Sequence, residues 1–151
     1  MIYIDFAINN IILNFFWILY LISLKGIVIK KDTITSIAIG GFDGMHLAHQ
    51  QLFNKLDNNG GIIVIQTSYA NISPFRHREK YTDYPIYFYP LENIKHLNGK
   101  QFIKLLKEEF PCLKKIVVGY DFHFGHQAAY DNKNLIDLFD GEVEIVDEYK
   151  I

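Results

Sequence analysis

The sequence predicts one α/β domain built on a parallel sheet of about five strands, with helices on both faces. Short unbroken runs of Val and Ile recur along the chain, and segments with helical spacing of apolar residues lie between them. Strands that are buried on both faces read as continuous apolar runs, and parallel strands need crossover connections that are usually helical. A chain of 151 residues suits one domain with a substantial core. The predicted architecture is therefore Rossmann-like.

The first predicted unit is a strand, a glycine-rich turn and a helix. Residues 36–39 form an apolar run that ends at Gly40 and Gly41, the pattern of a buried strand stopped at a tight backbone site. Apolar residues then recur at helical spacing over residues 47–56, before the Asn-Asn-Gly-Gly turn of residues 58–61.

The later elements continue the alternation. Further strands are expected at residues 62–65, 86–89, 115–118 and 143–146, and further helices at residues 99–110 and 134–139. The polar and aromatic residues 67–84 are expected to form a loop, long enough to be functional. Ligands of such sheets bind beyond the carboxyl ends of the strands, where the strand order reverses. Residues 40–49 and 119–125 both follow apolar strands, so we expect them to meet at one edge.

Charge and cysteine content exclude some classes of function. Fifteen Lys and Arg against seventeen Asp and Glu give a net charge of −2, so no basic field favours a nucleic-acid partner. The single cysteine, Cys112, cannot form an internal disulfide or supply a structural zinc site. A cytoplasmic location is expected.

Residues 8–29 are almost continuously apolar and are expected to form an apolar N-terminal helix. A secretory signal fits poorly, because Lys follows the run instead of preceding it. Two interpretations stay open: a membrane anchor, whose cytoplasmic flank would be Lys25, Lys30 and Lys31, and apolar sequence added by an upstream start codon. We therefore divide the chain into an extension, residues 1–32, and a domain, residues 33–151.

Two histidines carry the clearest chemical signal. His46 and His49 are three residues apart at the start of a predicted helix, directly after a glycine-rich turn. Residues at this spacing share a helix face, and the free amides of a helix start attract anions. The pair suits nucleotide phosphates, although a metal pair completed by Asp43, or two ordinary surface histidines, also fits the spacing.

The residues around this pair resemble the Gly-x-Phe-Asp-Gly-x-His-x-Gly-His signature of the nucleotidylyltransferase superfamily. This segment reads Gly40-Gly41-Phe42-Asp43-Gly44-Met45-His46-Leu47-Ala48-His49, and a later one reads Val117-Val118-Gly119-Tyr120-Asp121-Phe122-His123-Phe124-Gly125. The second is similar to the Val-Gly-x-Asp-Phe-x-Phe-Gly signature of the same family. Together they resemble the FMN adenylyltransferase domain of the bifunctional riboflavin kinase/FAD synthetase family, over residues 33–151.

The resemblance implies transfer of AMP from ATP to FMN, which yields FAD and pyrophosphate. His46 and His49 would be the catalytic residues, holding the ATP phosphates and stabilising charge in the transition state. Mg²⁺ would accompany ATP, held mainly by substrate oxygens with no dedicated protein site. The implied ATP-binding residues are Gly40, Gly41, Phe42, Asp43, Gly44, Gly119, Asp121, Phe124 and Gly125. Phe122 would also shape the wall, and core packing is the alternative for at least one of Phe122 and Phe124.

The implied flavin side is the loop of residues 67–84. Arg76 and Arg78, with His77 between them, would meet the FMN phosphate, although exposed basic residues on a loop are usually only solvated. The expected partners are the small-molecule substrates ATP and FMN, and the sequence leaves the oligomeric state open.

This sequence departs from the family at three places. Ala48 stands where the family has Gly, and residues 126–131 lack the usual Arg and Gly. The Ser/Thr-rich segment that grips the triphosphate in the family does not occur by Ile151, and neither does the family's kinase domain. We therefore expect no riboflavin kinase activity, and weak or no adenylyl transfer by this chain alone. The alternatives are a truncated, non-catalytic nucleotide-binding remnant and another nucleotidylyltransferase of the same fold.

Overall fold

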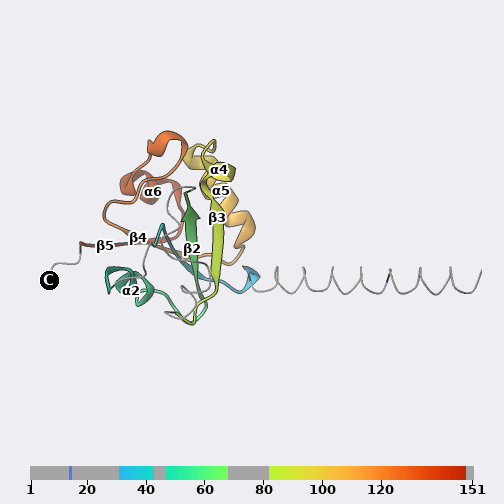
Figure 1. The fold of residues 1–151 in the computed structure, drawn as a ribbon, viewed down its shortest axis with the longest axis vertical. Helices are drawn as coiled ribbons and strands as arrows, with labels where there is room; N and C mark the ends of the chain where they lie inside the picture. Colours follow the sequence, from blue (N-terminus) through green and yellow to red (C-terminus); the bar gives the residue numbers. More distant parts are fainter. Residues whose placement is uncertain (1–13, 15–30, 43–46, 68–81, 149–151) are drawn as a thin grey trace, which may run out of the picture.

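The computed structural model describes residues 31–42, 47–67 and 82–148, together with residue 14. Its centre is a parallel sheet of five strands in the order β3-β2-β1-β4-β5 (Figure 1). The strands are β1 (Ser36–Gly40), β2 (Gly60–Gln66), β3 (Ile86–Pro90), β4 (Lys115–Gly119) and β5 (Glu142–Val146). The predicted α/β fold with about five parallel strands is confirmed.

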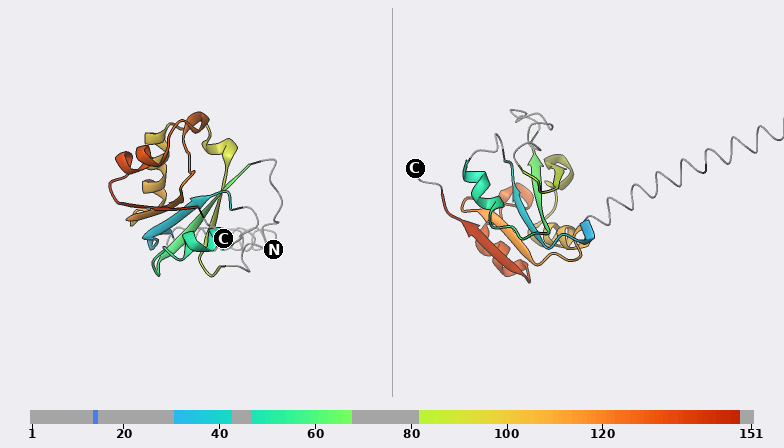
Figure 2. Two further views of the ribbon diagram at one scale, coloured as in Figure 1. Left: turned by 90° about the vertical axis from the view of Figure 1, so that its left-hand side faces the viewer. Right: turned by 90° about the horizontal axis from the view of Figure 1, so that it is seen from below.

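Helices cover both faces of the sheet, as predicted. The helices are α2 (Leu47–Phe53), α4 (Leu91–Ile94), α5 (Gly99–Glu109) and α6 (Asn132–Leu138), with a 3₁₀ turn η3 (His126–Ala128). Figure 2 shows α2 on one side of the sheet and α5 and α6 on the other. Two buried clusters match this division: Leu52 and Phe53 of α2 pack with Ala38, whereas Phe102 of α5 and Leu135 of α6 belong to the other cluster.

The strands form where the sequence is apolar because the sheet interior is dry. Ile37, Ile62, Ile63, Ile116 and Val117 have no exposed surface at all, as expected for strands that are covered on both faces. The outer strand β3 is only partly buried. The five apolar runs therefore set the strand positions.

Local sequence signals define both ends of α5, which lies on the face of the sheet opposite α2. Asn98 caps α5 through a capping box, in which its side chain accepts from the Gln101 N–H at 2.9 Å and the Gln101 side chain accepts from the Asn98 N–H at 2.9 Å. Phe102 and Leu106 are buried on the inner face, and the helix ends before Pro111.

Two helix predictions need correction, and the turn predicted at residues 58–61 is shorter, since Gly60 and Gly61 already belong to β2. The helix expected at residues 134–139 begins earlier, at Asn132, because Asp131 and Asn134 form a capping box that starts it. The helix expected over residues 47–56 has its last helical residue at Phe53, and a tighter turn follows, in which the Leu56 N–H donates to the Phe53 carbonyl at 3.1 Å. Leu56 is still buried, so the apolar spacing marked the core and not the helix end.

Lys31, at the start of the described segment 31–42, contacts the domain. Its ammonium lies 3.1 Å from the Glu109 carboxylate and over the rings of Tyr87, Tyr89 and Phe110. Tyr89 also donates a hydrogen bond to Glu109. The expected apolar helix over residues 8–29 lies outside the described residues. Among the residues that are described, no helix has both the length and the apolar character needed to cross a membrane.

Candidate functional site

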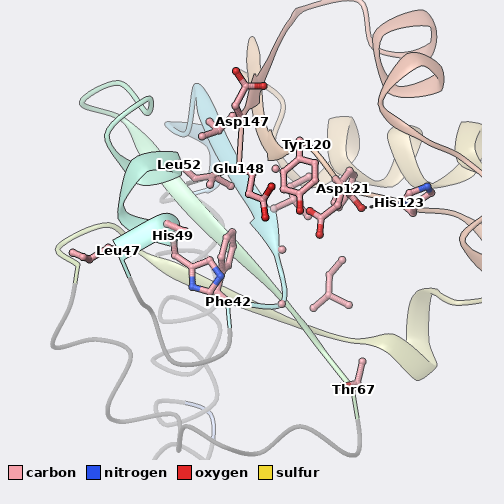
Figure 3. A pocket seen from close by; sticks show the side chains of 18 residues that line it. Phe42, Leu47, His49, Leu52, Thr67, Tyr120, Asp121, His123, Asp147 and Glu148 are labelled. Carbon is pink, nitrogen blue, oxygen red and sulfur yellow. Dashed lines mark hydrogen bonds between the residues drawn. The ribbon is translucent and has the colours of Figure 1, made fainter. Parts of the chain in front are cut away.

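A cavity of about 840 Å³ opens at the carboxyl edge of the sheet, between the ends of β1 and β4. The chain runs outward from β1 through β2 to β3 and then returns to place β4 on the other side of β1. Strand order reverses at this point, which is where α/β sheets bind ligands. Figure 3 shows Phe42 and His49 on one side of the cavity and Tyr120 and Asp121 on the other.

The structure brings together the two segments that were expected to meet. Gly40, Gly41, Phe42 and His49 line the cavity from the first segment, and Gly119 and Asp121 line it from the second. Asp43, Gly44 and His46 lie outside the described residues, as do the predicted flavin-side residues Arg76 and Arg78. The predictions for these five residues stay predictions.

Phe124 and Gly125 do not line the cavity. Phe124 is 5% exposed and packs in the core against Phe102 and Tyr130. Gly125 has a φ of 76°, a left-handed conformation that favours glycine, and the Tyr130 ring lies against it. Phe122 lies on the cavity side of the same segment, with its ring stacked 5.8 Å from that of Phe124. Core packing, the alternative given for at least one of these two phenylalanines, therefore applies to Phe124, whereas Phe122 lines the cavity.

Phe42 organises the first wall. Its φ is 48°, which is unusual for a residue with a large side chain, and its ring is 4% exposed. The ring contacts that of His49 edge-on, with centroids 5.2 Å apart and an interplanar angle of 82°, and also contacts Phe53. A Cβ added at Gly40 would lie 2.9 Å from the Phe42 ring, so Gly40 is required by this packing. An added Cβ at Gly41 would meet no atom within 4 Å.

The opposite wall is a tight turn after β4. The Phe122 N–H donates to the Gly119 carbonyl at 3.2 Å, and the Tyr120 N–H donates to the Val146 carbonyl of β5 at 3.0 Å. A Cβ added at Gly119 would lie 3.3 Å from the Asp121 carboxylate, so the carboxylate folds close over the glycine backbone. The ring nitrogen Nδ1 of His123 is 2.8 Å from the Asp121 carbonyl.

The described wall of the cavity is acidic. Asp121, Asp147 and Glu148 line it, and in the described part of that lining the side chains that can become positive are His49 and His123. The Glu148 carboxylate raises the pKa of Tyr120, and partial desolvation and Asp121 act in the same direction. No group of three or more His, Cys, Asp or Glu side chains suited to a metal ion occurs within residues 31–42, 47–67 and 82–148.

Sequence reasoning missed several residues of this wall. Tyr120 was noted only as the variable position of a motif, and Thr67, Asp147 and Glu148 were not noted as site residues, although all four border the cavity. Each lies one or two residues after the end of β2, β4 or β5. Because carboxyl ends of parallel strands share one edge, that position was the available signal.

Comparison with known proteins supports the fold and goes no further. A crystal structure of a macrolide-efflux protein from Streptococcus pneumoniae matches with a TM-score of 0.60 and 21% sequence identity. The match covers 76% of this chain and 52% of the other, so the present chain spans about half the length of that protein. No protein-family model matches the chain, and no curated protein matches it.

Proposed function

We propose that this chain binds ATP in the cavity between β1 and β4 and is an FMN adenylyltransferase domain, which transfers AMP from ATP to FMN at a low rate when it acts alone. One observation carries the proposal. The two segments that resemble the signatures of this enzyme family are far apart in the sequence, yet residues from both line the same cavity. That cavity lies at the strand-order reversal, where nucleotides bind in open α/β sheets.

The proposed reaction needs no nucleophile from the protein. An oxygen of the FMN phosphate attacks the α-phosphorus of ATP, the bond from that phosphorus to the bridging oxygen breaks, and pyrophosphate leaves with the bond electrons. Acceleration would come from holding the reacting phosphates in line and from compensating negative charge. We assign His49, which lines the cavity, to donate to a phosphate oxygen, with His46 as its proposed companion.

The acidic wall fits the use of Mg²⁺ with ATP. Asp121, Asp147 and Glu148 would repel a free triphosphate, whereas carboxylates and phosphate oxygens are the hard ligands that Mg²⁺ prefers. The ion neutralises phosphate charge when it is bound. We propose that substrate oxygens hold most of the coordination sphere, as is usual for Mg²⁺ bound with a nucleotide.

The test is to incubate the purified chain with FMN, Mg²⁺ and ATP labelled on the α-phosphate, and to follow labelled FAD. We expect the double variant His46→Ala, His49→Ala to lose FAD formation by about 100-fold or more. His96→Ala is the matched control, since His96 is exposed and does not line the cavity. FAD formation that persists in the double variant would exclude a catalytic role for His46 and His49. ATP binding without FAD formation would favour the non-catalytic alternative.

A further inference from the structure

The turn after β4 receives support from a residue outside both sequence motifs. Asn132, the first residue of α6, lies behind this turn. Its side-chain Nδ2 donates to the Gly119 carbonyl at 3.2 Å and to the Tyr120 carbonyl at 3.0 Å. A side-chain amide carries two N–H groups, so each carbonyl can receive its own proton. One side chain thus holds two consecutive peptide units of the cavity wall.

The position of Asn132 is itself fixed. Asp131 caps α6, accepting from the Asn134 N–H at 3.1 Å, and the Asn134 side chain accepts from the Asp131 N–H at 2.9 Å. Leu135, one turn into the helix, is fully buried. Since Asp131 satisfies the helix start, the Asn132 side chain is not needed for capping and is available to the turn.

The Asn132 side chain is partly buried, and its bond to the Gly119 carbonyl is partly shielded from water. The Oδ1 atom of Asn132 is buried and has no hydrogen-bond partner among the described residues. A buried acceptor without a partner destabilises the folded state. The two hydrogen bonds donated by Nδ2 offset this cost. A residue without donors at this position would leave the Tyr120 carbonyl, on the cavity wall, without that partner.

We infer that Asn132 is a positioning residue of the nucleotide pocket, which holds the Gly119–Asp121 backbone so that the Tyr120 and Asp121 side chains keep their places in the cavity wall. The inference rests on the proposed function for its ligand. Asn132 does not line the cavity and acts through the turn that it supports.

The test compares two substitutions on α6. Asn132→Asp keeps the shape of the side chain but places a charged oxygen against two carbonyl oxygens, while an acid is well tolerated in the first turn of a helix. We expect affinity for Mg-ATP to fall about tenfold. Asn134→Ala removes half of the capping box instead, so it should lower the melting temperature and leave the affinity unchanged.

A pH series adds a readout that a general loss of packing would not produce. When its carboxyl is protonated, the Asn132→Asp variant can again donate one hydrogen bond to the turn. Its deficit in affinity relative to the unmodified chain should therefore shrink as the pH falls toward about 4. Asn132→Leu has no titratable group and should show a constant deficit. A deficit that does not change with pH in Asn132→Asp would overturn the inference.

The remaining outcomes separate this inference from the proposed function. Equal ATP affinity of Asn132→Asp and the unmodified chain would overturn it, and so would an equal loss of affinity in Asn134→Ala. If the unmodified chain does not bind ATP, the proposed function fails, and amide hydrogen exchange of Tyr120 and Phe122 in the ligand-free protein becomes the test. Faster amide exchange in Asn132→Asp, but not in Asn134→Ala, would support the positioning role. Exchange in Asn132→Asp at the rate of the unmodified chain would overturn it.

Discussion

The ring of Phe42 lies between Gly40 and His49, and it contacts the imidazole edge-on with centroids 5.2 Å apart. This arrangement couples the backbone of the first motif to the side chain proposed to meet phosphate. Phe42 adopts a left-handed backbone conformation to do so, which costs of order 1–2 kcal/mol. Backbone strain of this kind is often found at functional sites.

Alanine at Gly40 should mainly lower stability, whereas alanine at Gly41 should mainly weaken ATP binding. Gly40→Ala would press a methyl group against the Phe42 ring, so we expect a loss of about 1–3 kcal/mol in the free energy of unfolding. Gly41→Ala meets no neighbour and should change stability by less than about 0.5 kcal/mol while weakening ATP binding. Urea denaturation and calorimetric titration measure the two effects. Equal stability loss in both variants would contradict this account of the turn.

Alanine substitutions at Phe122 and Phe124 should also differ in their effects on stability and on ATP affinity. Phe124→Ala opens the core and should cost about 3–5 kcal/mol of stability. Phe122 is partly exposed on the cavity side, so Phe122→Ala should cost less stability and more ATP affinity. Thermal unfolding and nucleotide titration of both variants check this. The account of this segment would be wrong if Phe124→Ala were the milder change in stability.

Glu148 should control how strongly ATP binding depends on Mg²⁺. Glu148→Gln removes one carboxylate from the acidic wall, so we expect tighter binding of Mg²⁺-free ATP and a smaller gain on adding Mg²⁺. The same change should lower the raised pKa of Tyr120 toward its ordinary value, because Glu148 is the main cause of the shift. Calorimetry with EDTA and NMR titration of the Tyr120 ring, assigned with Tyr120→Phe, measure these effects. An unchanged Tyr120 titration would argue against an electrostatic effect of Glu148 on Tyr120.

Glu144 should make stability depend on acid pH. Lys115 donates a hydrogen bond to Glu144 at 2.6 Å and lowers the pKa of that carboxyl. A lowered pKa means that the stabilisation is present above the unfolded pKa, near 4.5, and is lost as the pH falls through the folded value. We expect Glu144→Gln to cost about 1 kcal/mol or less at neutral pH.

That cost should disappear at a pH below the folded pKa of Glu144. The matched control is Glu142→Gln, because Glu142 is 3.8 Å from Lys115 and 66% exposed, so its effect should be smaller at every pH. Urea denaturation at several pH values is the measurement. A deficit of constant size across the acid range would contradict the ion pair.

The sequence predicted the sheet well because the central strands β1, β2 and β4 are buried. Runs such as residues 116–118 contain no polar residue, so they can be identified directly as buried strands. The short helix α4, directly after Pro90, was not predicted because four residues carry no readable period. The start of α6 was misplaced because the Asp131 capping box uses Asn at the position where Glu or Gln is the familiar signal.

The site was predicted where local motifs define it and missed where tertiary packing does. Gly40, Phe42 and Asp121 were identified from motifs, and the structure places them on the cavity. The same motif could not tell that Phe124 turns into the core while Phe122 does not, because that choice depends on Phe102 and Tyr130 from other segments. Asn132 had no signal, since its partners are backbone carbonyls twelve and thirteen residues earlier.

The placement of β4 beside β1 has a consequence for folding. The cavity, which lies across these two strands, cannot form until residues 115–117 have returned to pair with residues 36–38. Loop closure over such a separation is slow compared with forming a local helix. Ligand would then select fully assembled molecules, so added ATP should raise the unfolding midpoint of the whole domain and leave partly assembled intermediates unaffected.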